Sequence, residues 1–345
     1  MVLLKTIWHN ALTATVAAVT LSLGTVGEAI AQTLEGAGAS FPAPLYERYF
    51  QQLKQDTGIT VNYNSVGSGK GIESFIADTV DFAGTDAPPV AAEIEQMPKG
   101  VVMVPTAGGA VAVVYNLPGV AELKLSQLVL PDIFAGKITK WNDRRIAQDN
   151  PGVDLPDLPI QTVVRADGSG TTFIFSRHLS AASPTFSREV GASRKPGWPK
   201  NPLEGNKNDG VAALVKETEG AIGYVQDTFA RRNNLSTAML ENLQGRFVEP
   251  TLEEANVALS GLRFYQDFTP ANEANPDDGY PIVGVTWLLI KANYETSEQA
   301  TAVKKMVNWV LKEGQNLNNT LEYTRVPEAI GAKILEKVES QVANN

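Results

Sequence analysis

Residues 165–172 read RADGSGTT and follow the apolar run 160–164. They precede Phe173 and the apolar residues after it, so the sequence predicts a strand, a Gly/Ser turn and the start of a helix. The first N–H groups of a helix have no intrahelical partner and lie at the positive end of the helix dipole. With the hydroxyls and Arg165 they can bind a tetrahedral anion. A loop with a helix N-cap and a surface ion pair between Arg165 and Asp167 is the alternative.

Two further segments repeat this pattern. Residues 36–44 read GAGASFPAP and precede apolar positions at helical spacing, with Ser40 at the expected N-cap. Residues 67–71 read GSGKG, and they lie between the strand-like run 59–63 and the apolar start of a helix. Three strand–turn–helix starts, each with a hydroxyl residue, favour convergence on one anion over three separate structural turns.

Several segments of the chain resemble the signature segments of the periplasmic phosphate-binding proteins of Pst-type ABC transporters. They are residues 36–44, residues 80–88 (VDFAGTDAP), residues 165–171, residues 208–211 (NDGV) and residues 220–225 (GAIGYV). The resemblance runs from about residue 36 to about residue 327. It implies an extracytoplasmic solute-binding protein that captures inorganic phosphate and delivers it to the membrane permease subunits of an importer. It implies no enzyme activity, no cofactor and no metal.

The expected architecture is α/β, because strand-like and helical runs alternate. The strand-like runs are residues 59–63, 81–84, 101–104, 110–116 and 160–164. The resemblance implies the two-domain, type II periplasmic binding protein fold, with the ligand cleft between the domains. If the chain crosses between domains at Gly108–Gly109 and near residues 276–281, domain I is residues 32–108 and 283–345. Domain II is then residues 109–282.

Residues 1–31 have the features of a secretory signal peptide. Lys5 gives a basic start, residues 11–26 are mostly apolar, and Ala29-Ile30-Ala31 fits the small-residue cleavage rule. A membrane anchor is the alternative, but the apolar stretch is short and broken by threonines. The sequence therefore predicts a soluble periplasmic monomer after cleavage.

Charge and cysteine content exclude other classes of site. The chain has no cysteine, which rules out disulfides, thiolate metal sites and a cysteine-anchored lipoprotein. The net charge of −9 is unfavourable for binding nucleic acid, since phosphate backbones need basic surfaces. A buried anion responds instead to nearby N–H dipoles and one arginine, because distant surface charges are screened beyond about 10 Å.

The resemblance assigns the ligand contacts position by position. Ser40 and Phe41 are expected to donate backbone N–H groups, with the Ser40 hydroxyl adding a bond. Ser68 is expected to donate a backbone N–H and a hydroxyl, and Arg165 its guanidinium. Asp167 is expected to orient Arg165. The remaining donors are expected from Ser169, Gly170 and Thr171.

Asp86 has an exceptional role in this set, because a carboxylate repels an anion. The resemblance implies that it accepts a hydrogen bond from a protonated phosphate oxygen, which sulfate at neutral pH lacks. A buried acceptor without a donor costs enough to exclude sulfate. A turn or helix cap before Ala87-Pro88-Pro89 is the alternative role of Asp86.

Two alternative functions remain open. The same donors could serve an extracytoplasmic phosphomonoesterase, or the fold could bind another tetrahedral oxyanion such as sulfate or molybdate. The sequence offers no clear nucleophile–base pair or metal-ligand cluster, since Ser169 and His178 lie nine residues apart at one helix start. Asp86 disfavours sulfate and molybdate.

Overall fold

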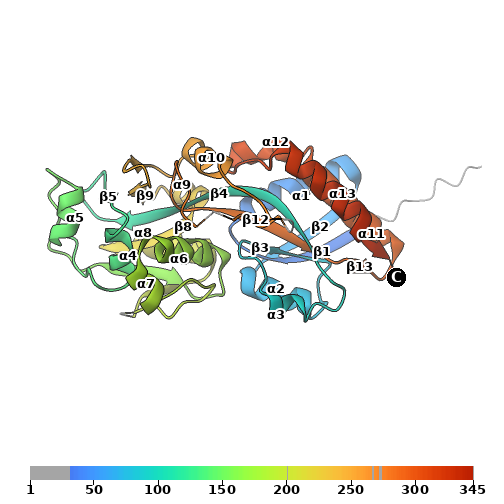
Figure 1. The fold of residues 1–345 in the computed structure, drawn as a ribbon, viewed down its shortest axis with the longest axis horizontal. Helices are drawn as coiled ribbons and strands as arrows, with labels where there is room; N and C mark the ends of the chain where they lie inside the picture. The colour runs from blue at the N-terminus through green and yellow to red at the C-terminus, as the bar shows by residue number, and fades with distance from the viewer. Residues whose placement is uncertain (1–31, 200, 266–267, 272–273, 345) are drawn as a thin grey trace, which may run out of the picture. The chain divides into compact units, whose positions relative to one another are not determined.

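The computed structural model describes residues 32–199, 201–265, 268–271 and 274–344. Its main sheet contains β1 (Thr33–Gly38), β2 (Thr60–Ser65), β3 (Phe82–Thr85), β4 (Val102–Asn116), β6 (Gln161–Arg165), β7 (Leu203–Gly205), β8 (Ala221–Gln226), β9 (Ser236–Thr237) and β12 (Val283–Ile290). The strand order is β2-β1-β3-β12-β4-β8-β6-β7, and β9 pairs with β4. Figure 1 shows β4 running through the middle of this sheet. The short strands are β5 (Lys124–Leu125), β10 (Met239–Glu241), β11 (Phe247–Val248), β13 (Asn293–Tyr294) and β14 (Ala343–Asn344).

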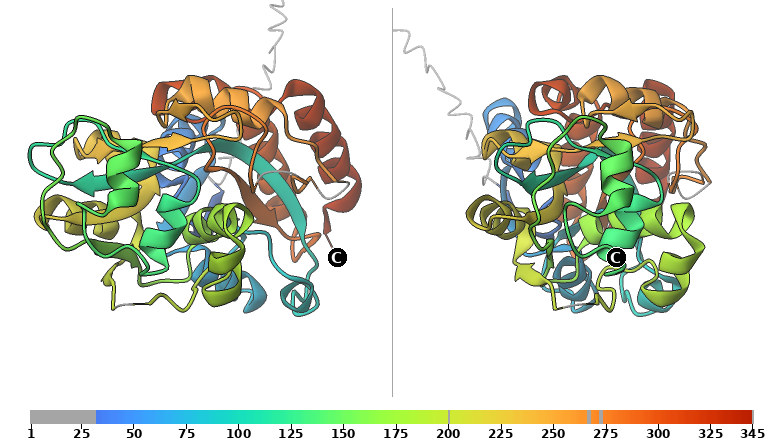
Figure 2. Two further views of the ribbon diagram at one scale, coloured as in Figure 1. Left: turned by 60° about the vertical axis from the view of Figure 1, so that its left-hand side comes forward. Right: turned by 90° about the vertical axis from the view of Figure 1, so that its left-hand side faces the viewer.

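Helices follow most strands. They are α1 (Ala43–Thr57), α2 (Ser68–Ile76), α3 (Ala91–Ile94), α4 (Val129–Phe134), α5 (Arg144–Asp149), α6 (Gly170–Ala182), α7 (Pro184–Glu189), α8 (Lys207–Glu217), α9 (Asp227–Arg232), α10 (Leu252–Ser260), α11 (Ser297–Leu311), α12 (Gln315–Asn318) and α13 (Glu328–Gln341), with a 3-10 turn at Asn319–Leu321. The C-terminal helices α11 and α13, red in Figure 1 and Figure 2, pack against each other, and α11 also packs against α1. The predicted α/β class is confirmed.

One long strand, β4, connects the two halves of the main sheet. Residues 102–110 of β4 pair with β12, and residues 111–116 pair with β8. We call β1, β2, β3, β12 and residues 102–110 the first half, and β6, β7, β8 and residues 111–116 the second half. The sequence offered residues 101–104 and 110–116 as strand-like runs with a candidate domain crossing at Gly108–Gly109; in the structure one strand, β4, runs through both glycines. Both glycines pair with β12. Neighbours leave Gly108 no room for a side chain, since a Cβ there would lie 2.6 Å from a Leu259 methyl group.

The three predicted strand–turn–helix units are confirmed. They are β1 to α1, β2 to α2, and β6 to α6. Within the first half β1 runs parallel to β2 and β3, and within the second half β6 runs parallel to β7 and β8. The carboxyl ends of parallel strands lie at one edge of a sheet, so the turns and helix starts after them gather there.

The predicted N-cap of the first unit was wrong. Pro42 is the residue before α1, and Ser40 lies two residues earlier. The Ser40 hydroxyl is engaged by α8 instead, as described below. The predicted apolar face of α1 is confirmed: Leu45, Tyr46, Tyr49, Phe50 and Leu53 are all buried. Tyr46 packs edge-on against Tyr63 of β2, which fixes the helix on the sheet.

Two other expectations concern membranes and metals. Across the described residues, no helix is both long enough and apolar enough to cross a bilayer. The same residues contain no cluster of three or more histidine, aspartate or glutamate side chains that could hold a metal ion. The predicted signal peptide, residues 1–31, lies outside the part of the chain that the structure describes.

Candidate anion-binding site

Residues from both halves of the sheet meet at the predicted turns. The Gly69 N–H at the start of α2 donates to the Gly168 carbonyl at 2.8 Å. The Gly170 N–H at the start of α6 donates to Ser68 Oγ at 3.1 Å. Gly69 and Ser68 follow β2 in the first half, whereas Gly168 and Gly170 follow β6 in the second. The structure therefore brings together segments that are about a hundred residues apart in the sequence.

Three hydroxyl groups at this junction belong to Ser40, Ser68 and Thr171, each at most 2% exposed. Each hydroxyl oxygen accepts two hydrogen bonds from the protein. Ser68 Oγ accepts from the Asp86 N–H at 3.3 Å and from the Gly170 N–H. Thr171 Oγ1 accepts from Arg165 at 3.4 Å and from Asn208 Nδ2 at 3.3 Å.

The Ser40 hydroxyl also accepts two hydrogen bonds, and both come from one residue, Asn208. Its Oγ accepts from the backbone N–H of Asn208 at 3.3 Å and from Asn208 Nδ2 at 2.9 Å. A hydroxyl oxygen has two lone pairs and one proton. With both lone pairs engaged, each of the three hydroxyls can still donate its proton. A side-chain hydrogen bond from Ser68 lowers the pKa of Asp86, so Asp86 competes with a ligand for the Ser68 proton. The site is thus set up to donate hydrogen bonds.

Backbone donors add to this set. The N–H groups of Ser40, Phe41, Ser68 and Thr171 have no hydrogen-bond acceptor among the described residues. Ser68 and Thr171 lie in the first turns of α2 and α6, where such N–H groups are free by geometry. Phe41 is fully buried, and its carbonyl accepts from the Tyr323 hydroxyl at 2.6 Å, which fixes this turn.

The cation of the site, Arg165, is 3% exposed and is held by Asp167. Arg165 Nε donates to Asp167 Oδ1 at 2.8 Å, and the adjacent nitrogen donates to Oδ2 at 2.5 Å. Burial alone raises the pKa of Asp167, but hydrogen bonds and charge from Arg165 outweigh it and hold that pKa below its usual value. The Lys207 N–H also donates to Asp167 Oδ1, at 3.0 Å. The guanidinium is therefore fixed in one orientation, and part of its donor capacity is left for a ligand.

Asp86 lies directly after β3, with 2% of its surface exposed. Thr286 Oγ1 donates to Asp86 Oδ1 at 2.8 Å. Burial raises the pKa of Asp86 to about 7, although the Thr286 hydrogen bond and the Arg165 charge lower it. Asp86 also abuts the start of α6, because a Cβ on Gly170 would lie 2.5 Å from Asp86 Oδ2. A carboxyl group titrating near neutrality, able to accept or to donate, therefore stands among the donors.

Ser169 differs from the other predicted ligand contacts, because most of its polar groups already make hydrogen bonds within the protein. It is the N-cap of α6, with Oγ accepting from the Thr172 N–H at 3.0 Å. Its own N–H donates to the Arg194 carbonyl at 2.9 Å. Only the Ser169 hydroxyl proton is left for a ligand. The Gly170 N–H is likewise committed to Ser68 Oγ.

Sequence reasoning did not include Asn208 among the site residues. Asn208 is fully buried in the first turn of α8, and it contacts both Ser40 and Thr171. Residues 208–211 were recognised only as a segment of family resemblance. The signal that could have identified Asn208 is an amide in the first turn of a helix that follows a strand parallel to β6.

Among the described residues, His178 is not placed to act as a base for a serine nucleophile in this site. His178 Nδ1 lies 3.1 Å from the Ala274 carbonyl. Burial lowers the pKa of His178 to about 4. Neither of these features places the imidazole on Ser169, whose hydroxyl instead caps α6.

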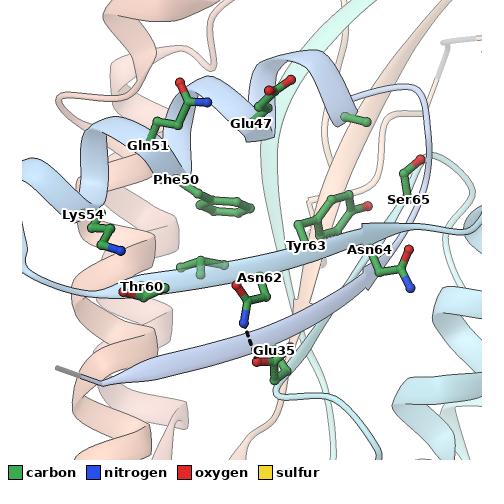
Figure 3. Close-up of a pocket in the computed structure, with 12 residues that line it drawn as sticks. Glu35, Glu47, Phe50, Gln51, Lys54, Thr60, Asn62, Tyr63, Asn64 and Ser65 are labelled. Atoms are coloured by element: carbon green, nitrogen blue, oxygen red, sulfur yellow. Dashed lines mark hydrogen bonds between the residues drawn. The ribbon is translucent and has the colours of Figure 1, made fainter. Parts of the chain in front are cut away.

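A separate pocket of about 650 Å³ lies between α1 and the edge strand β2 (Figure 3). Glu47, Gln51 and Phe50 of α1 face Asn62 and Tyr63 of β2 across it. Its lining contains none of the predicted ligand-contacting residues and carries two carboxylates, Glu35 and Glu47, against one lysine. This pocket is therefore unsuited to an anion.

Comparison with known proteins places the chain among described families. A family model described as a PBP superfamily domain matches residues 24–313. "Phosphate-binding protein PstS" of Pasteurella multocida is 38% identical over 321 residues, which cover 91% of this chain and 92% of that protein. The protein of the same name from Haemophilus influenzae is 35% identical and covers 93% of this chain and 96% of its own length.

Solved structures show the same fold. A high affinity periplasmic phosphate-binding protein (PfluDING) bound with phosphate has a TM-score of 0.72 at 22% identity, covering 88% of this chain and 93% of that chain. A putative phosphate ABC transporter substrate-binding protein from Clostridium perfringens, with bound phosphate, has a TM-score of 0.62 at 20% identity, covering 86% and 100%. This likeness confirms the predicted two-domain, type II periplasmic binding protein fold.

Proposed function

This chain belongs to the PstS family of phosphate-binding proteins, and we propose that it captures inorganic phosphate and delivers it to an ABC importer. One observation carries the proposal. The hydroxyls of Ser40, Ser68 and Thr171 each accept two protein hydrogen bonds, so each is left as a donor at one buried point. Converging donors with one arginine are the chemistry that a tetrahedral oxyanion requires.

Asp86 directs this donor set to phosphate. HPO4²⁻ and H2PO4⁻ carry a proton that an ionised carboxylate can accept, whereas sulfate carries none. Because Asp86 is 2% exposed, a mismatched oxygen could not be relieved by bulk water. The residues proposed to contact phosphate are Ser40, Phe41, Ser68, Asp86, Arg165, Ser169 and Thr171, with Asp167 orienting Arg165 and no metal or cofactor taking part. The Gly170 N–H, predicted as a further ligand donor, holds Ser68 Oγ instead.

We assign the site to the cleft between two domains, residues 32–108 with 283–345 and residues 109–282. The pairing of β4 supports this division, because its partner changes from β12 to β8 between Ala110 and Val111. The hydrogen bonds from Gly69 to Gly168 and from Gly170 to Ser68 then cross the cleft. Domain closure would bury the anion and form these bonds together.

The proposed setting is the periplasm. Cleavage after residue 31 would release a soluble monomer that binds phosphate and docks on the permease subunits of the transporter. The relatives named above are phosphate-binding proteins, and this supports a binding role over an enzymatic one. The position of His178, hydrogen-bonded to Ala274, also argues against the phosphomonoesterase alternative.

The test is an isothermal titration of residues 32–345 after unfolding and refolding to strip bound ligand. We expect tight one-to-one binding of phosphate, no competition by sulfate, and no hydrolysis of p-nitrophenyl phosphate. A folded protein that ignores phosphate would overturn the proposal. Steady hydrolysis of the ester would favour the phosphomonoesterase.

A further inference from the structure

Asn208 connects the two halves of the candidate site through one buried amide. Its Nδ2 donates to Ser40 Oγ at 2.9 Å and to Thr171 Oγ1 at 3.3 Å. Ser40 follows β1 in the first half of the sheet, and Thr171 lies in the first turn of α6 in the second half. We infer that Asn208 is a positioning residue for phosphate: it turns the Ser40 and Thr171 hydroxyls so that both donate to the anion. This inference rests on the proposed function.

The orientation of the amide is fixed by its other end. Asn208 Oδ1 accepts the backbone N–H of Gln226 at 2.9 Å, at the end of β8. A backbone N–H can only donate, so the amide oxygen must face Gln226 and the NH2 group must face the hydroxyls. Because Asn208 is fully buried, water cannot substitute for either interaction.

The amide therefore determines the direction of both hydroxyl protons. A serine or threonine hydroxyl rotates to suit its neighbours and can accept from an anion's protonated oxygen as readily as it donates. Once its lone pairs are filled, only donation remains. For Ser40 both partners come from Asn208, its backbone N–H and its Nδ2. For Thr171 one partner is Asn208 and the other is Arg165.

The same contact links donor orientation to domain closure. Asn208 lies in α8, and α8 packs on β7 and β8 of the second half, whereas Ser40 belongs to the first half. The bond to Ser40 forms only when these segments meet. Ser40 is thus turned toward the ligand as the two halves come together, which adds a gain in affinity to the closed arrangement.

The decisive variant is Asn208→Asp. An aspartate has the same shape and keeps an acceptor for the Gln226 N–H, but it cannot donate, so the hydroxyl protons would turn toward it and away from the ligand. Because this variant also adds a negative charge, we expect its phosphate affinity to fall by at least about 100-fold, mostly through faster dissociation.

Asn150→Asp is the matched control, since Asn150 is another buried asparagine and hydrogen-bonds to Lys124 and Ile146 far from the site. It should lower the melting temperature and leave affinity unchanged.

A double-mutant cycle separates positioning from a purely structural role. Asn208→Ala should weaken phosphate binding about 10-fold in the unmodified background, and about 3-fold or less when Ser40→Ala is already present. Equal losses in both backgrounds would overturn the inference, as would a folded Asn208→Asp protein with unchanged affinity. The cycle also decides the matter if Asn208→Asp does not fold. Failure of the unmodified protein to bind phosphate would instead overturn the proposed function and, with it, this inference.

Discussion

Replacing Asp86 by asparagine should convert a phosphate-selective site into one that also accepts sulfate. The asparagine oxygen can keep the bond from Thr286 Oγ1, which is 2.8 Å long in the present structure. The NH2 group then stands where Asp86 Oδ2 lies, beside the start of α6. A group that can only accept at pH 8, where the carboxyl is ionised, becomes one that donates, so an oxyanion without a proton no longer meets an unpaired acceptor.

The size of the effect follows from burial. Two unit charges about 4 Å apart repel by about 4 kcal/mol at the effective dielectric constant of about 20 that describes protein sites. Asp86 is 2% exposed, so little of this is screened by solvent. We therefore expect sulfate affinity to rise by about 100- to 1000-fold in Asp86→Asn. Phosphate affinity should fall, because the acceptor for its proton is lost.

The pKa of Asp86 adds a pH dependence with a definite sign. Burial raises that pKa to about 7, so the carboxylate is ionised at pH 8 and mostly protonated at pH 5.5. The protonated form can donate to sulfate. Sulfate exclusion by the unmodified protein should therefore weaken as the pH falls from 8 to 5.5, whereas Asp86→Asn should bind sulfate equally at both pH values.

The assay is isothermal titration of both proteins with each anion at pH 8 and pH 5.5, using Asn150→Asp as the control for a change at a distant buried position. An Asp86→Asn protein that is folded and still excludes sulfate at pH 8 would refute the reasoning. So would sulfate exclusion by the unmodified protein that is the same at both pH values.

Three further predictions concern other residues. Arg165→Ala should weaken phosphate binding by about 100-fold or more in titrations, because it removes charge-assisted donors and leaves the half-buried Asp167 without its cation. Unchanged affinity would remove Arg165 from the site. Gly170→Ala should abolish phosphate binding in a protein that still folds, since the new Cβ would lie 2.5 Å from Asp86 Oδ2. In Gly69→Ala the nearest neighbour of the new Cβ lies at 3.3 Å, so this variant should lose far less phosphate affinity. Similar phosphate affinities for the two variants would contradict this reasoning. His178 has its pKa lowered to about 4 by burial, so the unfolded chain binds a proton that the folded protein does not, and about 3 kcal/mol of stability should be lost as the pH falls from 6.5 to 4. Melting curves recorded from pH 6.5 to 4 should show a smaller loss of stability in His178→Gln than in the unmodified protein. An equal loss in both proteins would exclude the histidine as its source.

The local sequence pattern was sufficient to predict those parts of the site that lie within a single turn of the chain. Arg165 and Asp167 are two residues apart, and both belong to a segment whose glycines and hydroxyls predict a helix start. The three strand–turn–helix units followed from the same kind of signal. The grouping of their turns followed from the rule that parallel strands present their carboxyl ends at one edge.

Long-range pairing explains what sequence reasoning missed. Asn208 and Ser40 are 168 residues apart, and no local pattern shows that an amide in α8 reaches the turn after β1. The late start of α1, at Ala43, was also not predicted, so Ser40 lies two residues before the N-cap and its hydroxyl meets Asn208 instead. The commitment of the Ser169 N–H to Arg194 depends on a loop that follows α7, which the spacing of residues 165–172 does not reveal.

The continuity of β4 was not predicted for a related reason. Gly108 and Gly109 indicated a hinge strand or a linker, because glycine is common where a chain changes direction, and the pattern did not decide between the two. In the structure packing requires a glycine at position 108, where Leu259 and Thr324 would lie 2.6 and 2.7 Å from a Cβ, whereas at Gly109 the nearest atom, of Phe41, would lie 3.3 Å away. The strand continues through both glycines and changes partner from β12 to β8.

The most direct test of the central claim is a crystal structure of residues 32–345 grown with phosphate. We predict one tetrahedral anion among the hydroxyls of Ser40, Ser68 and Thr171, within hydrogen-bond distance of Arg165, and with one oxygen on Asp86. Density for phosphate between α1 and β2, or a folded protein with no anion at the three hydroxyls, would contradict the account.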